Sequence, residues 1–401
     1  ILLAAAGTFA LTMGTRQTMG LFLSDVNSAT GLGIANISLA FAFGQLWWGL
    51  TQPFAGAFAD RVGAGRVLLI GVSLVALGTI LTPLMTSTAG LVFAIGVLAA
   101  GGAGMAGPSV LMAATTRMLP AERRGMATGI VNAGGSFGQF IMAPVAAGLT
   151  AALGWMTSMQ VLGLIVLLAL PAAWVLRGNS SAAATSAPAG VAGGPAPARE
   201  GTRAAITRAL ADPSYRLLAC GFFVCGFHVA FLATHLPNVV AMCGLPPSVS
   251  AWSLGLLGLF NIVGSLTMGW AVGRWRMKSL LSLVYAARAV AVLVFLLSPK
   301  TATTMLIFAA VMGLTYLSTV PPTAGLVAKF FGPANMATLF GIVMLSHQIG
   351  GFTGAWLGGK VFTMTGSYDT IWIIDILLAV GAALVHMPIK EAALPPKVQP
   401  A

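Results

Sequence analysis

The sequence predicts an all-α membrane protein that crosses the bilayer twelve times, in two six-helix bundles related by pseudo-symmetry. Of its 401 residues, 58% are apolar and only 7% are charged, whereas a soluble protein has about a quarter charged residues. Twelve apolar segments have the length, about 20 residues, that one crossing requires. The chain also contains 50 glycines, and glycine allows helices in lipid to approach each other closely.

The predicted crossings form two groups of six on either side of a long connection. They fall at about 1–23, 37–59, 66–86, 90–112, 126–149, 153–176, 214–241, 250–271, 279–298, 301–328, 335–360 and 367–388. Residues 178–200 are rich in Ala, Gly, Pro and Ser, and lack the large apolar side chains that would offset the entropy of ordering, so a flexible linker is expected. The predicted domains are an N-terminal bundle, a cytoplasmic linker, a C-terminal bundle and a cytoplasmic tail, at 1–177, 178–212, 213–390 and 391–401. Within the linker, 201–212 is expected as a short basic helix beside anionic lipid, with plain linker as the alternative.

Basic residues predict the orientation in the membrane. With a cytoplasmic N-terminus, sixteen of the twenty Lys and Arg residues fall on the cytoplasmic side, and only Lys300 and Lys360 fall on the opposite side. Positive residues gather in cytoplasmic loops, so both termini are expected in the cytoplasm. The expected location is a cell inner membrane. The same distribution explains the net charge of +12 without nucleic acid as a partner.

Nothing in the sequence indicates an enzyme. The three cysteines, Cys220, Cys225 and Cys243, lie at apolar positions without metal-ligand spacing. Glycine-rich stretches at 99–107 and 132–138 lie inside apolar spans, without the strand and lysine of a phosphate loop, which indicates helix packing. No paired carboxylates or Ser-His-Asp set can be placed at the membrane midplane. We therefore expect no catalytic residue, metal or cofactor.

The two halves resemble each other. PAERRGMATGI at 120–130 precedes the fifth span, and PANMATLFGI at 333–342 precedes the eleventh. GAFADRVGAGR at 56–66 corresponds to the degraded GWAVGRWRMK at 269–278. Parallel repeats joined by a cytoplasmic linker are typical of transporters whose halves rock about a site near the midplane.

The stretch GAFADRVGAGR resembles the loop between the second and third helices of the Major Facilitator Superfamily. In it, Asp60 can pair with Arg61 and Arg66 at a cytoplasmic helix end, while Gly56 and Gly63 permit a tight turn. The resemblance implies the major facilitator fold, a monomer, and a gating role for Asp60, Arg61 and Arg66. An ordinary charged loop is the alternative.

Over most of its length the chain is similar to the monocarboxylate-transporter branch of this superfamily. TRQTMGLFLSD at 15–25 corresponds to the part of the first helix that carries the family's substrate-binding lysine, and Arg16 falls on that position. Animal members carry an Asp and an Arg one turn apart in the eighth helix, where this chain has Asn261 and Ser265. Proton coupling is therefore not implied. Three further similar stretches are HLPNVV (235–240), YLSTVPPTAGLV (316–327) and SHQIGGFTGAWLGG (346–359).

Three charged residues, Arg16, Arg288 and Asp375, lie deep in spans, where a charge costs about 3 kcal/mol. The neighbouring cavity helices contain no acidic residue, so Arg16 is expected to bind a substrate carboxylate with its planar guanidinium. The alternatives for Arg16 are snorkelling to the helix end and bonding to carbonyls. Arg288 and Asp375 are expected to form a structural ion pair or a secondary site, and His228 is interpreted as a packing histidine.

Neutral polar residues in the spans are the second set of candidates for substrate binding. They share a helix face or lie beside a proline, as transporter sites do, and comprise Gln45, Gln52, Asn132, Gln139, His235, Asn238, Tyr316, Ser318, His347 and Gln348. For each of them, an interhelical hydrogen bond worth about 0.6 kcal/mol is the alternative. If H+ is the coupling ion, His235 and His347 are expected to bind it.

These observations predict a secondary active or facilitative transporter that moves a small organic anion, a monocarboxylate, by alternating access. Import, export, proton symport, exchange and uniport all stay open. The alternatives are an efflux carrier for neutral or amphipathic molecules, with Arg16 structural, and a transporter-like membrane sensor. A membrane enzyme is disfavoured because the catalytic residues are absent.

Overall fold

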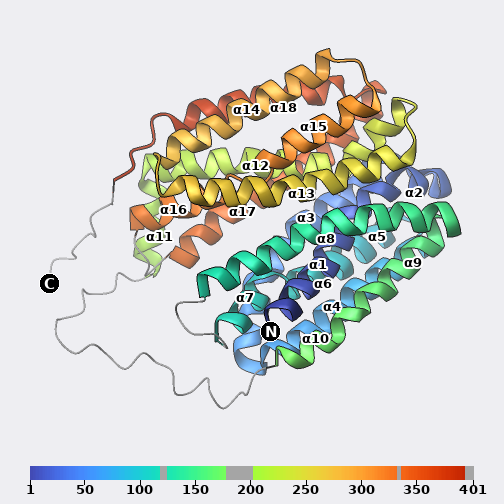
Figure 1. Cartoon of the computed structure of the whole chain (residues 1–401), viewed down its shortest axis with the longest axis horizontal. Coiled ribbons are helices and arrows are strands. Elements are labelled where there is room, and N and C mark those ends of the chain that lie inside the picture. Colours follow the sequence, from blue (N-terminus) through green and yellow to red (C-terminus); the bar gives the residue numbers. More distant parts are fainter. Residues whose placement is uncertain (118–123, 178–201, 332–335, 393–401) are drawn as a thin grey trace.

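A computed structural model describes residues 1–117, 124–177, 202–331 and 336–392. All regular elements in these residues are helices, and they form two bundles, one from each half of the chain (Figure 1). The helices of the first bundle are α1 (Leu2–Thr18), η1 (Met19–Phe22), α2 (Leu23–Thr30), α3 (Ile34–Val62), α4 (Ala64–Leu81), η2 (Thr82–Leu84), α5 (Thr88–Leu91), η3 (Val92–Ala100), α6 (Gly101–Met105), α7 (Pro108–Arg117), α8 (Arg124–Leu153), α9 (Trp155–Val166), η5 (Leu167–Ala169) and α10 (Leu170–Val175).

The second bundle follows a short helix, α11 (Thr202–Ala211), which lies within the stretch 201–212 that the sequence left open between helix and linker. Residues 178–201 and 393–401, which include most of the predicted linker and tail, lie outside the described residues. The remaining helices are α12 (Pro213–Met242), α13 (Pro247–Val272), α14 (Met277–Leu297), α15 (Ala302–Thr315), α16 (Val320–Phe331), α17 (Met336–Thr365) and α18 (Asp369–His386).

The prediction of a twelve-helix, all-α membrane fold is confirmed. Nine helical segments among the described residues are long and apolar enough to cross a membrane. The other three predicted crossings correspond to α1 with its continuation into α2, to α3 and to α17. These three crossings carry the polar residues Arg16, Gln45 and Gln348, which lower the mean hydropathy of the segments. The same three residues line a cavity.

Glycine brings the helices of each bundle into backbone contact. A Cβ added to Gly14 on α1 would lie 2.6 Å from the backbone carbonyl carbon of Gly138 on α8. A Cβ added to Gly102 on α6 would lie 2.7 Å from the backbone nitrogen of Val75 on α4. Real side chains do not pack this closely, so glycine is required at both crossings. The glycine-rich stretches therefore serve helix packing, as their position inside apolar spans predicts.

Two prolines in the second half have opposite effects on their helices. Pro237 lies inside α12, which continues through it. In the tenth span, α15 ends at Thr315 and α16 begins at Val320, one residue before Pro321. The interruption at 316–319 leaves the last carbonyls of α15 without helical partners, and side chains of neighbouring helices bond to them.

Candidate functional site

A cavity of about 1200 Å³ lies between the two bundles and is lined by residues of both. The lining includes Arg16 on α1 and Gln348 on α17, and it continues to Gly56 in the last third of α3 and to Thr338 near the start of α17. α11 and α16 lie at this same end of the molecule, and α2 lies at the opposite end (Figure 1). The described lining residues include no Asp or Glu, and Arg16 is the one Lys or Arg among them.

Arg16 is half-buried and contacts only neutral groups among the described residues. Its Nη2 donates to Oε1 of Gln45 on α3. Its Nη1 lies 3.9 Å from the Met13 sulfur, and the guanidinium carbon lies 4.9 Å from the centroid of the Trp48 ring. A guanidinium has five N–H donors, so these contacts leave it able to bind an anion that enters the cavity.

Gln45 connects Arg16 to the second bundle. Its Nε2 donates to Oε1 of Gln348 at 3.1 Å. Gln348 is 1% exposed, and its own Nε2 has no partner among the described residues. A buried N–H without a partner costs free energy. The unpaired amide and the open side of Arg16 are therefore two donors that an acceptor in the cavity would satisfy.

Seven of the eleven residues predicted to bind substrate line this cavity. Gln52 accepts a hydrogen bond from Ser109 (3.1 Å), and the Tyr316 hydroxyl donates to the Val229 carbonyl (2.9 Å). The His347 ring packs on Phe222, with ring centroids 4.9 Å apart. The seven are Arg16, Gln45, Gln52, Asn132, Tyr316, His347 and Gln348.

The other four predicted residues, Gln139, Ser318, His235 and Asn238, are not among the lining residues. Gln139 is fully buried beside Gly258, where α8 packs on α13. Ser318 is 1% exposed and donates to the Leu314 carbonyl. Neither residue makes the interhelical hydrogen bond that was the alternative: the Gln139 amide has no partner among the described residues, and Ser318 bonds within its own span.

His235 and Asn238 belong to a hydrogen-bonded chain that joins the two bundles. Ser24 on α2 donates to Asn238 Oδ1 (2.9 Å), and Asn238 Nδ2 donates to the Tyr368 hydroxyl (2.9 Å). The Tyr368 hydroxyl lies 3.0 Å from His235 Nδ1, and His235 Nε2 lies 2.7 Å from the Ala355 carbonyl. Every contact is satisfied if His235 is neutral with its hydrogen on Nε2. Ser24 and Tyr368 were not among the predicted site residues, although Ser24 lies in the similar stretch 15–25.

Tyr368→Phe is expected to lower the free energy of unfolding by about 2 kcal/mol, because it removes a partner from two buried polar groups. The stack on Phe362, with ring centroids 4.8 Å apart, is kept. The effect therefore reports the hydroxyl alone. Thermal unfolding of the purified protein in detergent measures it, and an unchanged midpoint would show that this chain adds no stability.

The predicted ion pair between Arg288 and Asp375 is corrected by the structure, because no direct contact joins these two described side chains. His228 lies between them: its Nδ1 is 3.3 Å from Arg288 Nη1, and its Nε2 is 3.0 Å from Asp375 Oδ1. All three side chains are 1% exposed. His228 is therefore a bridge between two charges and not a packing residue, which residue spacing alone could not show.

A family model described as Major Facilitator Superfamily matches residues 4–355 and 218–400. This chain belongs to the Major Facilitator Superfamily. It is a membrane transporter and not an enzyme, as predicted.

Members of the superfamily from animals and bacteria are similar to this chain along most of its length. Monocarboxylate transporter 13 of Rattus norvegicus is 24% identical over 399 residues, which cover 97% of this chain and 88% of the relative. The uncharacterized MFS-type transporter YcxA of Bacillus subtilis (strain 168) is 23% identical over 393 residues, with 94% and 92% covered.

Solved structures of other superfamily transporters share the fold. A mutant of the nucleoside transporter NupG superposes with a TM-score of 0.78 at 14% identity, covering 97% of this chain and 98% of NupG. A bacterial homolog of the human lysosomal transporter Spinster, in an inward-facing and unoccupied conformation, gives 0.77 at 15% identity, with 96% and 95% covered. At such identities the likeness shows the fold alone.

Asn261 and Ser265, where the resemblance implies an Asp and an Arg in animal members, lie at the cavity. Asn261 and Ser265 both line it, and the Ser265 hydroxyl donates to Asn261 Oδ1 (3.2 Å). Asn261 Nδ2 donates to Ser136 in the first bundle (2.8 Å). The Asn261 amide thus joins the two bundles without a charge.

The predicted gating residues lie at the end of α3 and the start of α4. Arg61 and Arg66 are exposed, and the Asp60 side chain lies outside what the structure describes. Gly63, between the two helices, has a φ of 92°, which only glycine adopts without strain. This is the tight turn that the motif predicts.

Proposed function

We propose that this member of the Major Facilitator Superfamily moves a small organic anion, a monocarboxylate, with Arg16 binding the carboxylate. The observation that carries the proposal is the charge of the cavity. Among its described lining residues Arg16 is the one Lys or Arg, and none is acidic. A cation that faces a cavity without a counter-ion in the protein needs an anionic ligand to offset its desolvation.

The contacts of Arg16 suit a carboxylate. Two guanidinium N–H groups can bind both carboxylate oxygens, and the unpaired Nε2 of Gln348 supplies a further donor. The Tyr316 hydroxyl already donates to the Val229 carbonyl, so towards a ligand it acts as an acceptor. A hydroxyl or keto group next to the carboxylate would suit such a mixed set of donors and acceptors. The printed name of the relative Monocarboxylate transporter 13 supports the same substrate class.

Transport is proposed to proceed by alternating access. The cavity reaches the end of the molecule near the start of α17, where Thr338 is exposed. At the other end, Ser24 and Asn238 join the bundles. With the predicted orientation, this is a conformation open to the cytoplasm, as in the inward-facing neighbour. Asp60, Arg61 and Arg66 would then gate the cytoplasmic side. We propose a monomer in the inner membrane with both termini in the cytoplasm.

H+ remains a candidate coupling ion. Both ring nitrogens of His235 bond within the protein, and His235 is not a lining residue. His347 lines the cavity and is the better candidate for a proton site. Exchange and uniport require neither residue to titrate.

A second candidate function, efflux of neutral or amphipathic molecules, is favoured by the size of the cavity. Its volume of about 1200 Å³ exceeds the several hundred Å³ of a typical small-molecule pocket. Most of its described lining residues are apolar. In this case Arg16 would be structural. A ligand-binding sensor without transport is the remaining alternative.

A thermal-unfolding screen in detergent decides between these functions. Monocarboxylates such as pyruvate and lactate are expected to raise the unfolding midpoint of the wild type, whereas dicarboxylates, amino acids, sugars and cationic amphiphiles are not. A ligand that binds only the folded state stabilises it by RT ln(1 + [L]/Kd). Stabilisation by amphipathic compounds alone would favour efflux. Binding of a monocarboxylate without flux into proteoliposomes would favour a sensor.

A further inference from the structure

The interruption of the tenth span at 316–319 is held by side chains of three neighbouring helices, and Cys225 on α12 contributes contacts to the Tyr316 carbonyl and the Thr319 hydroxyl. Arg288 on α14 donates through Nη2 to the carbonyls of Thr315 and Tyr316, the latter at 2.8 Å. Asn261 on α13 accepts from the Leu317 N–H at 3.0 Å. The Thr315 carbonyl belongs to the last turn of α15, and the Tyr316 carbonyl follows it directly. Backbone carbonyls at the end of a helix lack partners within the helix. Arg288 therefore acts as a cap for the broken helix.

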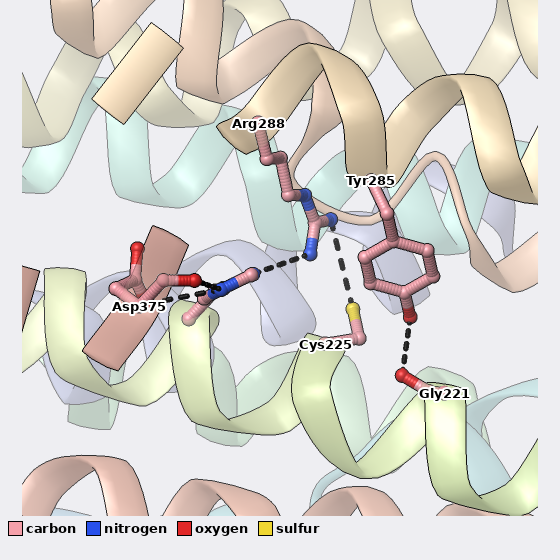
Figure 2. Close-up of polar contacts among 6 residues, drawn as sticks. Gly221, Cys225, Tyr285, Arg288 and Asp375 are labelled. Atoms are coloured by element: carbon pink, nitrogen blue, oxygen red, sulfur yellow. Dashed lines mark hydrogen bonds and ion pairs between the residues drawn. The ribbon is translucent and has the colours of Figure 1, made fainter. Parts of the chain in front are cut away.

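The orientation of Arg288 is set through His228 and Asp375. Because Arg288 Nη1 can only donate, His228 Nδ1 must accept. The hydrogen of the imidazole is then on Nε2, which lies 3.0 Å from Asp375 Oδ1 and 3.2 Å from the Asp375 carbonyl. Figure 2 shows Arg288 on one helix and Asp375 on another, at opposite ends of this set of contacts. The network contains one positive and one negative charge, separated by a neutral ring.

Further contacts fix the guanidinium in place. Arg288 Nη2 lies 3.7 Å from the Cys225 sulfur, and the Tyr285 ring lies below the guanidinium with its centroid 5.2 Å from the central carbon (Figure 2). Tyr285 is itself held by a hydrogen bond to the Gly221 carbonyl (2.6 Å). A planar fork of donors can reach the carbonyls and the imidazole together, which the compact ammonium of lysine cannot.

The first residue of the capped break forms part of the cavity. Tyr316 lines the same cavity as Arg16, and its hydroxyl is fixed on the Val229 carbonyl of α12. Arg288 is 1% exposed and is not a lining residue. Arg288 therefore cannot touch a ligand in the cavity, and its contacts with Thr315 and Tyr316 connect it to a lining residue.

We propose that Arg288, oriented by His228 and Asp375, is a positioning residue that holds the broken tenth span so that Tyr316 forms the cavity wall. The link to substrate affinity rests on the proposed function, whereas the capping of the break does not. The alternative is that Arg288 only balances the buried charge of Asp375.

A charge-balanced double variant separates these two roles. Arg288→Met with Asp375→Asn removes both charges and the cap, so no buried charge is left unpaired. Asp375→Asn alone keeps Arg288 and its bonds to the Thr315 and Tyr316 carbonyls, and His228 Nε2 still faces the backbone carbonyl of residue 375. It leaves the buried guanidinium without a counter-charge, so it shows the effect of charge balance alone. The first readout is hydrogen–deuterium exchange of the ligand-free full chain, measured by mass spectrometry over residues 313–323. In the double variant the exchange rate of this segment is expected to rise about tenfold, because the loss of a hydrogen bond to a charged group makes local opening easier by about that factor. Exchange in α4 is the internal control.

Transport gives the second readout. With pyruvate as probe, the KM of the double variant is expected to rise about tenfold with kcat within about twofold, because the variant alters binding and not the rocking step. The single variant keeps the cap, so it is expected to match the wild type in exchange over 313–323 and in KM, while the unpaired buried charge lowers its unfolding midpoint. Unchanged exchange in the double variant would overturn the proposal, whatever its transport rate. If pyruvate is not transported by the wild type, the proposed substrate fails, and the exchange result still decides the role of Arg288.

Discussion

Replacing Arg16 with glutamine is expected to reduce monocarboxylate uptake into proteoliposomes about 100-fold, because a charge-assisted pair worth about 2.7 kcal/mol is lost. In the wild type, Arg16 is the one Lys or Arg among the described residues that line the cavity. Glutamine can still bond to Gln45, so the contact between α1 and α3 has a substitute. The loss should therefore appear mainly in KM. The measurement is initial uptake of the monocarboxylate that most stabilises the wild type.

Two further variants give this result its meaning. Arg16→Lys keeps the charge but not the planar fork, so an intermediate KM is expected. Arg274→Gln removes an exposed arginine that lies on the Trp270 ring outside the cavity, and it should leave KM unchanged. Wild-type uptake by Arg16→Gln would refute the anion site and favour a structural role for Arg16.

Gly138→Ala is expected to destabilise the first bundle by about 2 kcal/mol, the typical cost of inserting a methyl group into a fully packed interface. The added Cβ would lie 2.5 Å from the Cα of Ala10 and 2.6 Å from its carbonyl carbon. Both are backbone atoms, so no side-chain rotation relieves the overlap. Because α1 must move away from α8, Arg16 should shift as well. Thermal unfolding and ligand affinity measure the two effects.

Gly148 provides a matched control on the same helix. It lies in α8, and a Cβ added to it meets nothing within 4 Å. Gly148→Ala should therefore only gain helix propensity, which is worth about 1 kcal/mol. Opposite shifts of the unfolding midpoint are expected for the two variants. Equal shifts would show that the crossing of α1 and α8 tolerates a methyl group.

The sequence was sufficient for the fold because the membrane imposes simple rules on it. Apolar length marks each crossing, and backbone groups in lipid must bond within helices. Helix ends and interruptions follow less directly. Pro321 and Pro322 signalled the break in the tenth span, but Pro237, also in an apolar span, interrupts nothing. A proline interrupts its helix when side chains of neighbouring helices can bond to the backbone groups that the interruption frees. The spacing of residues in the sequence does not show which side chains those are.

The candidate site was less predictable, since it depends on how helices distant in the sequence face one another. Arg16 and Gln348, 332 positions apart, both line the cavity. His235, predicted by the same reasoning, points instead into a chain with Tyr368. His228 had no distinguishing signal, because its importance comes from Arg288 and Asp375 on two other helices.

The hydrogen bonds from Arg16 through Gln45 to Gln348 have a consequence for the transport cycle under the proposed function. A carboxylate would bind the N–H groups of Arg16 that Gln45 leaves free, so the hydrogen bonds from Arg16 to Gln45 and on to Gln348 would persist while the anion neutralises the guanidinium. In the empty protein the same hydrogen bonds hold an uncompensated positive charge between the bundles, and closing the cavity around that charge costs free energy. The return without cargo would therefore be the slow step. A carrier of this kind exchanges one anion for another faster than it accumulates either.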